Sequence, residues 1–330
     1  MKNIISGLSI FKNVSLFIVV LIGLGLRCSK EQDMKPKTTL MDFGIRASNL
    51  FFYYSDLDQA TAFYTETLGM QVVADYGMAK ILRVASTSYL ILVDAADGMH
   101  SADEPKTVAI ALVTDQLDEW YTYLKAQGVE IKFEYNPTEG RPHDGFVALD
   151  PEGYYLEFER FNDHSENDKF IPILAQLESI YPVSGQKTTC LPGLGFKSMI
   201  TWLYYKNIEG MQRFYEDVMG LEMIVDQGWT KIYQVSSSGF TGLVDETKGM
   251  HSFTKKKAVN VSFIIDDIEG WFAYVKKHQP FVLRSKKIEV GIDKKFQAFI
   301  GYDPEGYYME FDKFHEHSTN EKLIKYLEGE

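Results

Sequence analysis

The feature that most constrains this chain is an internal repeat. The segment Ala148–Phe161 (ALDPEGYYLEFERF) returns as Gly301–Phe314 (GYDPEGYYMEFDKF), and most of the differences are conservative exchanges. Working outward, Tyr53–Met70 pairs in the same register with Tyr204–Leu221. Self-similarity over this length indicates that one structural unit occurs twice. The sequence therefore predicts two tandem copies of about 115 residues each.

The repeat and the composition shifts around it divide the chain into six segments. We predict an export signal at 1–28, a polar tether at 29–46, a first domain at 47–161, a linker with a helix at 162–197, a second domain at 198–314 and a C-terminal helix at 315–330.

Each copy contains a smaller pattern that occurs twice. Residues 49–54 predict a strand, Asp56 can cap a helix over 56–67, and Gly69 can end that helix. The remaining elements follow from apolar alternation and turn residues. They are strands near 71–75, 79–84, 89–94 and 107–113, a helix at 116–126, strands near 131–135, 144–149 and 153–160, a linker helix at 171–180 and a C-terminal helix at 320–327. Each copy thus holds two βαβββ modules.

The N-terminus has the pattern of an export signal. Lys2 and Lys12 precede the uncharged run Val14–Leu26, and Cys28 follows it at once. This arrangement resembles a bacterial lipoprotein signal, in which Cys28 would carry the lipid, although Arg27 stands where that pattern has a small residue. The resemblance implies an exported protein anchored to a membrane in the periplasm or at the cell surface. A plain cleaved signal and an uncleaved anchor are the alternatives.

Composition excludes several classes of protein and partner. A hydrophobic content of 45% is high enough to build cores, so global disorder is excluded. Two cysteines are too few for a disulfide scaffold or a cysteine-based zinc module. A formal charge of −12 argues against nucleic acid as a partner. Contact with a membrane is expected only through the N-terminal anchor.

The motifs resemble those of one superfamily. Phe63-Tyr64 with Leu68-Gly69, and the closing Asp150-Pro-Glu-Gly-Tyr-Tyr, are similar to motifs of the vicinal oxygen chelate proteins, which include glyoxalases, bleomycin resistance proteins and extradiol dioxygenases. The resemblance implies an α+β fold with two glyoxalase-like domains, each built on a curved eight-stranded mixed sheet. It also implies a pseudo-dimer within the chain, a concave cleft for a small-molecule ligand and, in many members, a divalent metal.

Strand alternation predicts which side chains face such a cleft. In the closing strand of the first copy, Leu156 and Phe158 share one face and pack toward the core. The other face carries Tyr155, Glu157 and Glu159, and the equivalent residues of the second copy are Tyr308, Glu310 and Asp312. By the resemblance, Glu157 and Glu310 match the carboxylate metal ligand of the family and could also act as bases. The alternative is a partly exposed glutamate on an open sheet.

The other ligand positions that the resemblance implies contain no histidine. They fall on Asn49 and Ala109 in the first copy and on Ile200 and Asn260 in the second. This set is poor for Zn²⁺ or Fe²⁺ and gives no support to a dioxygenase site. A divalent ion such as Mg²⁺, Mn²⁺ or Zn²⁺ is still an expected cofactor of the family, with Glu157 and Glu310 as weak candidate ligands.

Two histidines and several aromatic residues complete the candidate sites. His100 and His251 lie in identical Gly-Met-His-Ser sequences and could act as acid, base or hydrogen-bond donor. The alternative is a loop histidine bonded to the backbone. The candidate ligand-binding residues are Asn49, Phe51, Tyr53, Tyr155, Trp202, Asn260 and Tyr308.

Three functional interpretations follow. The first is a glyoxalase-like enzyme, a lyase or isomerase, that acts on a small oxygen-rich organic molecule through a carboxylate base or a weak metal site. The second is a binding or sequestering protein without catalysis, which the missing histidine ligands favour. In the third, one domain has degenerated, and Ile200 makes the second domain the better candidate.

Overall fold

The computed structural model describes residues 44–329. The predicted export signal, Cys28 and nearly all of the tether lie outside the described residues, so those assignments stay predictions. No helix among residues 44–329 is long and apolar enough to cross a membrane.

The elements follow the predicted order closely. Up to the linker they are β1 (Ile45–Tyr54), α1 (Leu57–Ala62), η2 (Phe63–Thr67), β2 (Gln71–Asp75), β3 (Ala79–Ala85), β4 (Ser88–Asp94), β5 (Val108–Val113), α2 (Leu117–Ala126), β6 (Ile131–Phe133), β7 (His143–Leu149), β8 (Tyr155–Phe161), η3 (Ser165–Asn167) and α3 (Phe170–Leu174). Beyond it they are β9 (Ser198–Tyr205), α4 (Ile208–Arg213), η4 (Phe214–Val218), β10 (Glu222–Asp226), β11 (Thr230–Gln234), β12 (Gly239–Asp245), β13 (Val259–Ile265), α5 (Ile268–His278), β14 (Val282–Leu283), β15 (Glu289–Val290), η5 (Ile292–Lys294), β16 (Phe296–Tyr302), β17 (Tyr308–Phe314), η6 (Ser318–Asn320) and α6 (Glu321–Glu328).

Local signals explain most of these boundaries. The Asp56 carboxylate accepts a hydrogen bond of 2.9 Å from the backbone N–H of Gln59, which caps α1. Gly69 takes a left-handed conformation with φ of +72° after η2. The predicted linker helix is wrong in length, because α3 ends at Leu174. Ile180 instead exchanges two backbone hydrogen bonds with Phe196, of 2.8 and 3.1 Å, and this bridge requires an extended chain.

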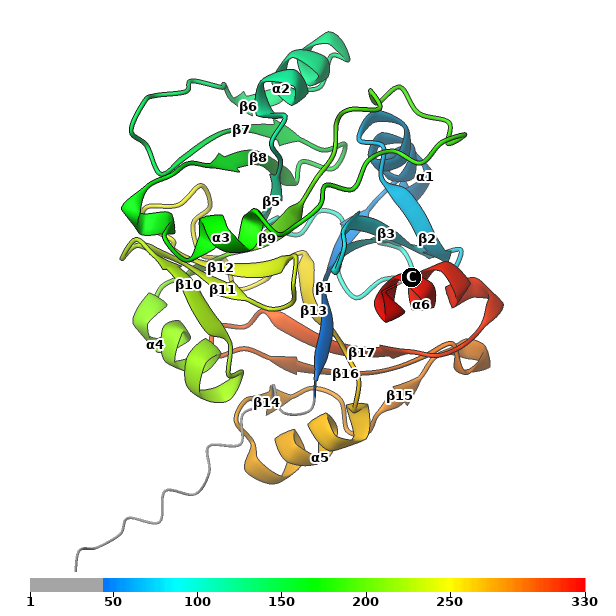
Figure 1. Ribbon diagram of the computed structural model, residues 1–330. Coiled ribbons are helices and arrows are strands. Elements are labelled where there is room, and N and C mark those ends of the chain that lie inside the picture. The colour runs from blue at the N-terminus through cyan, green and yellow to red at the C-terminus, as the bar shows by residue number, and fades with distance from the viewer. Residues whose placement is uncertain (1–43, 330) are drawn as a thin grey trace, which may run out of the picture. The chain divides into compact units, whose positions relative to one another are not determined.

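The strands form two mixed sheets (Figure 1). We call the first sheet A, with the order β14-β16-β17-β13-β1-β4-β3-β2 and with β15 paired to β16. We call the second sheet B, with the order β10-β11-β12-β9-β5-β8-β7-β6. An α+β fold with two large mixed sheets is therefore confirmed.

The expectation that each sequence copy forms its own sheet is wrong. Sheet A joins the first module of the first copy to the second module of the second copy, through an antiparallel pairing of β1 with β13. Sheet B joins the two remaining modules, through an antiparallel pairing of β5 with β9. The four modules have similar edges, so pairing between the copies satisfies the same backbone groups as pairing within a copy.

The repeated Asp-Pro-Glu-Gly turns hold the two modules of each copy together. The buried carboxylate of Asp150, beside sheet B, accepts hydrogen bonds of 2.7 and 3.0 Å from the hydroxyls of Tyr54 and Tyr64, beside sheet A. In the second copy, Asp303 accepts a 2.7 Å hydrogen bond from Tyr205. The most conserved element of the repeat is thus a connection between sheets.

Helices cover part of each concave sheet face. Phe170 and Leu174 of α3 pack in the apolar cluster on the concave face of sheet B. Leu323 of α6 packs in the corresponding cluster of sheet A. Figure 1 shows α6, in red, beside β2 and β3, and the Tyr326 hydroxyl of α6 donates a 2.8 Å hydrogen bond to the side chain of Gln71 in β2. Each helix that follows a copy therefore packs on a module of the other copy.

Candidate functional sites on the two concave faces

The polar residues of the candidate site converge on the concave face of sheet A. Their positions follow from alternation along three neighbouring strands and from the register that pairs Asn49 with Ser262 and Ser262 with Glu310. The residues on this face include Asn49, Phe51 and Tyr53 from β1, Asn260 and Ser262 from β13, and Tyr308, Glu310 and Asp312 from β17. The predicted cleft face of the closing strand is confirmed.

Two donors from β13 bind the two carboxyl groups of β17. The Asn260 amide donates a 2.6 Å hydrogen bond to Glu310 Oε2, and the Ser262 hydroxyl donates a 2.6 Å hydrogen bond to Asp312 Oδ2. Asn49 completes the row with a long hydrogen bond of 3.5 Å from its amide to the Ser262 hydroxyl. Each carboxyl group is therefore held in one orientation by its neighbouring strand.

His100, in the loop that follows β4, is hydrogen-bonded to Asn260 on this face. Its Nε2 lies 3.0 Å from Asn260 Oδ1, and its Nδ1 lies 2.8 Å from the carboxylate of Glu104. The ring stands edge-on against Tyr53 and Tyr308, with centroid distances of 4.9 and 4.5 Å. The sequence pointed to His100 but gave it no partner. The structure links it, through Asn260, to Glu310 of the other copy.

A cavity of about 440 Å³ opens on this face, and Glu310 and Asp312 both line it. Most of its wall is apolar, from residues such as Phe51, Ile81 and Phe314. Four of its lining side chains are large, apolar and exposed, which is uncommon for a surface without a ligand. They are Met78, Met99, Val290 and Ile292. A concave, mostly apolar cavity with a few polar groups is typical of a small-molecule site.

The two carboxyl groups hold protons more strongly than ordinary carboxylates. Burial raises the pKa of Glu310 well above its usual value, and the nearby charge of Asp312 raises it further. Burial also raises the pKa of Asp312 to about 7, against a smaller lowering by the Ser262 hydroxyl. A group such as Asp312, which gains and loses a proton near neutral pH, is suited to acid–base chemistry.

The equivalent face of sheet B is largely apolar. Beside Glu157 and Glu159, the neighbouring strand β5 presents Ala109 and Ala111, where sheet A has Asn260 and Ser262. Burial raises the pKa of Glu157 to about 7 and that of Glu159 well above its usual value. The four positions that the resemblance assigned to ligands thus divide by sheet, with the two asparagines in sheet A and Ala109 and Ile200 in sheet B.

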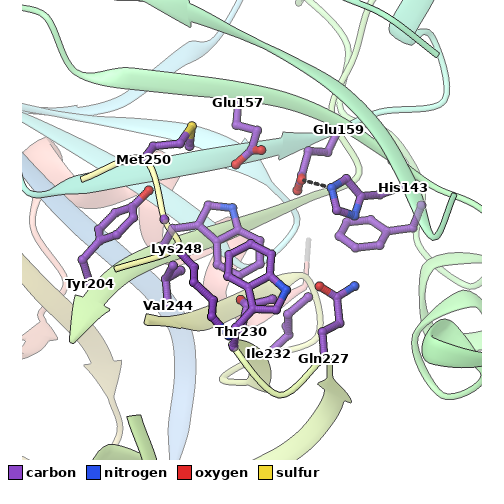
Figure 2. Close-up of a pocket in the computed structure, with 14 residues that line it drawn as sticks. His143, Glu157, Glu159, Tyr204, Gln227, Thr230, Ile232, Val244, Lys248 and Met250 are labelled. Carbon is purple, nitrogen blue, oxygen red and sulfur yellow. Dashed lines mark ion pairs between the residues drawn. The ribbon is translucent and has the colours of Figure 1, made fainter. Parts of the chain in front are cut away.

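Trp202 occupies much of the cleft of sheet B. A Cβ atom added to Gly242 would lie 1.9 Å from the Trp202 ring, so the indole packs directly on the bare backbone of β12. The cavity that remains has a volume of about 110 Å³ (Figure 2). Sheet B is therefore the reduced site, whereas the sequence pointed to the second copy.

His251 does not have the surroundings of His100. Its ring lies between Tyr155 and Tyr204, at centroid distances of 4.2 and 5.0 Å, and its Nε2 has no hydrogen-bond partner. Burial lowers the pKa of His251 to about 4, against a raising effect of the Val108 backbone carbonyl. Lys255 stands four residues later, where Glu104 follows His100. His251 is therefore neutral at physiological pH and is not connected to a carboxyl group of the cleft.

The residues of sheet A fit a metal ion poorly. No three His, Cys, Asp or Glu side chains among residues 44–329 are arranged to hold a metal. The amide and hydroxyl groups nearest the carboxyls point N–H and O–H donors at them, which leaves fewer oxygen atoms for a cation. The divalent metal stays a prediction.

Sequence reasoning missed Glu104 and Ser262. Glu104 lies four residues after His100 and forms an ion pair with it, and Ser262 lies two residues after Asn260 on the same strand face. The i+2 spacing could have identified Ser262. Glu104 is in a loop, where no periodicity indicates direction.

Comparison with known proteins agrees with this geometry. The sequence profile of the Glyoxalase/Bleomycin resistance protein/Dioxygenase superfamily matches residues 46–158. Residues 46–158, the two modules of the first copy, therefore match a domain of this superfamily. No curated protein sequence matches the chain.

Solved structures of this superfamily's fold resemble the whole described region. Glyoxalase I from Zea mays has 15% sequence identity and a TM-score of 0.54, over 86% of this chain and 95% of that chain. A putative dioxygenase from Bacillus subtilis subsp. subtilis str. 168 has 12% identity and a TM-score of 0.56, over 83% of this chain and 86% of that chain. At such low identities the similarity shows a shared glyoxalase-like fold.

Proposed function

We propose that the cavity of sheet A binds a small organic molecule and that Glu310 exchanges a proton with a carbon atom next to its carbonyl group. The observation that carries this proposal is the position of Glu310. Its buried carboxyl group lines the cavity and is fixed by Asn260, which is in turn bonded to His100. The superfamily contains glyoxalases, and this arrangement supports lyase or isomerase chemistry within it.

This step moves only a proton within the substrate, so it needs neither an oxidant nor a reductant. In the molecules in which Asp312 carries the proton of the pair and Glu310 is ionised, Glu310 takes a proton from the carbon and returns it to the neighbouring carbon or oxygen. Asp312, when protonated, can donate a hydrogen bond to the oxygen on which charge develops. The apolar wall of the cavity excludes water, which strengthens both interactions. The Glu104 carboxylate and the Asn260 amide oxygen hold the two nitrogens of the His100 ring, which positions the Asn260–Glu310 pair.

Hydrogen exchange at carbon tests this function without knowledge of the natural substrate. Small ketones such as 2-butanone and acetophenone are incubated with the protein in D₂O, and loss of the α-proton signal is followed by NMR. Glu310→Gln should slow protein-dependent exchange by about 10²–10⁴-fold, because it removes the base. The matched variant Glu157→Gln in sheet B should retain it. Equal loss in both variants, or in neither, would contradict the assignment.

Binding without catalysis is the second candidate. It is favoured by the hydrogen bonds of Asn260 and Ser262, which already occupy the two carboxyl groups, and by the apolar wall. Thermal shifts by the same ketones, equal in the wild type and in Glu310→Gln and without exchange, would support this function. Addition of Mn²⁺, Mg²⁺ or Zn²⁺ in the same assay tests the predicted metal.

We also propose that the protein is exported and anchored through a lipid on Cys28, on the strength of the apolar run that precedes this cysteine. Expressed in a bacterium, the full chain should partition with membranes and be released by the Cys28→Ala substitution. Equal membrane binding by both forms would point to an uncleaved anchor, and equal solubility would point to a plain cleaved signal.

A further inference from the structure

The pocket of sheet B contains buried polar atoms without a protein partner. Glu159 Oε2 and Thr230 Oγ1 make no hydrogen bond, although their residues are only 1% and 5% exposed. The indole N–H of Trp202 also lacks a well-formed hydrogen bond, although it lies close enough to Glu157 to lower the pKa of that group. All of these residues line one pocket of about 110 Å³. Buried polar atoms are nearly always paired, so a pocket that collects several unpaired ones points to a ligand.

The carboxyl groups of Glu157 and Glu159 in sheet B lack the hydrogen-bond donors that the neighbouring strand supplies in sheet A. In sheet A, Asn260 and Ser262 satisfy the carboxyl pair, whereas Ala109 and Ala111 carry no donor. His143 is the nearest basic group, with Nε2 3.9 Å from Glu159 Oε1, and burial lowers its pKa, so it is mostly neutral. The donors beside the carboxyl pair of sheet B are therefore weaker than those of sheet A: the Trp202 indole N–H near Glu157, and either carboxyl group, when protonated, toward the other.

The remaining walls of this pocket are aromatic and aliphatic. Trp202, Tyr204 and Trp229 line it together with Ile232 and Val244. Figure 2 shows Glu157 and Glu159 on one side of the pocket and Thr230 and Ile232 on the other. Aromatic faces attract cations, and apolar walls favour an alkyl group. A ligand that combines a cationic N–H donor with a short alkyl chain matches both sides.

We propose that this pocket binds a small protonated primary amine, with the ammonium group on Glu157 and Glu159 and the alkyl part between Trp202 and Ile232. The volume suits a molecule of about four or five non-hydrogen atoms, since an apolar cavity of about 150 Å³ holds a benzene ring. This site is separate from the cavity of sheet A and does not depend on the function proposed there.

Binding should depend on pH in one direction. The carboxyl pair keeps protons near neutral pH, and the ammonium group replaces them, so affinity should increase as pH rises through about 7. The other titratable groups that line the pocket are His143 from β7, Tyr204 from β9 and Lys248 from the loop after β12. Lys248 is exposed and carries a charge of the same sign as the ligand, so it opposes binding weakly.

The test compares n-propylammonium with 1-propanol, which has the same number of non-hydrogen atoms and no charge. Trp202 and Trp229 line the pocket, so tryptophan fluorescence and calorimetry both report binding. We expect propylammonium to bind at least about tenfold more tightly than propanol. Glu159→Gln should weaken amine binding by about tenfold or more, whereas Asp312→Asn, the matched change in sheet A, should leave it unchanged.

Lys248→Ala provides a second variant at an exposed position, where folding is not at risk. Loss of this like charge should strengthen amine binding by about two- to threefold. Equal binding of propylammonium and propanol, no amine binding at about 10 mM, or full binding by Glu159→Gln would each overturn the proposal. Weaker amine binding by Lys248→Ala would also contradict it.

Discussion

At the scale of single residues, the two clefts differ at two equivalent positions of the strand that neighbours the carboxyl pair. Asn260 and Ser262 of β13 donate to the carboxyl pair of sheet A, and Ala109 and Ala111 of β5 leave the pair of sheet B without donors. The two sheets are built from the same kind of module in the same order. The equivalent buried carboxyl groups are therefore hydrogen-bonded, through Asn260, to His100 in sheet A, whereas in sheet B they line an open pocket.

The buried carboxyl groups should make stability fall as pH rises. Burial raises the pKa of Asp150 and Asp303 to about 6 and that of Glu157 and Asp312 to about 7, compared with an ordinary value of about 4. The native state therefore binds more protons than the unfolded state. The stabilisation is complete below pH about 4 and is lost as pH rises through 6 to 7.

Urea unfolding at pH 5 and pH 8 measures this effect. Between these pH values a group whose pKa rises from about 4 to about 6 contributes about 1.4 kcal/mol, and one whose pKa rises to about 7 contributes about 2.7 kcal/mol, so the free energy of unfolding should fall by several kcal/mol. Asp312→Asn should show a smaller fall than the wild type because the neutral amide does not titrate. A free energy that stays constant or rises over this range would contradict the prediction.

At the scale of elements, the Asp-Pro-Glu-Gly-Tyr turns connect the sheets. The Tyr154 hydroxyl accepts a 3.0 Å hydrogen bond from the backbone N–H of Tyr53 and donates one of 2.7 Å to the Ala258 carbonyl. One side chain from a turn of sheet B thus contacts both modules that make up sheet A. Tyr307 repeats the arrangement with Tyr204 and Thr107.

Tyr154→Phe should destabilise the protein without changing its fold. The variant keeps the ring, which is stacked on Phe52 at 3.8 Å, and leaves a buried N–H and a buried C=O without a partner. We expect a loss of about 1–3 kcal/mol, measured by chemical denaturation. Tyr307→Phe should cost a similar amount, and Tyr181→Phe, at an exposed position of the linker, serves as the control. Equal stability of Tyr154→Phe and this control would show that the hydroxyl contacts are not needed.

At the scale of the whole molecule, neither sheet corresponds to one sequence copy, because each sheet combines a module of the first copy with a module of the second. The strand pairs β1–β13 and β5–β9 join different copies, and the repeated turns join the modules within a copy. Neither copy alone contains a complete sheet. The pseudo-dimer is thus an exchange of modules between the two copies, and each concave face takes residues from both.

Two half-chains should therefore assemble with each other. Residues 44–193 and 194–329, produced together as separate polypeptides, should form a one-to-one complex with the circular dichroism spectrum of the whole chain. The physical reason is that each half alone leaves the inner edges of β1 and β5, or of β9 and β13, without backbone partners. Size-exclusion chromatography with light scattering measures the assembly. Two folded, monomeric halves that do not associate would contradict the module exchange.

The sequence by itself determined the modules of this protein. Alternation and turn residues predicted nearly every strand and the helix that begins after Asp56, and they placed Glu157 and Glu310 on concave faces. These features are local, because side-chain direction along a strand depends only on neighbouring positions. For the same reason His100 could be singled out as a candidate but could not be given a partner.

Only the tertiary structure decided which modules share a sheet, and hence which candidates share a site. Because the repeated modules offer similar edges and similar apolar faces, their sequences do not distinguish pairing within a copy from pairing between copies. The observed pairing brings His100 and Asn49 of the first copy to Asn260 and Glu310 of the second. It leaves Glu157 beside alanines and Trp202. The resemblance to the superfamily follows from local sequence, and the division of chemistry between the two clefts follows from contacts between residues more than a hundred positions apart.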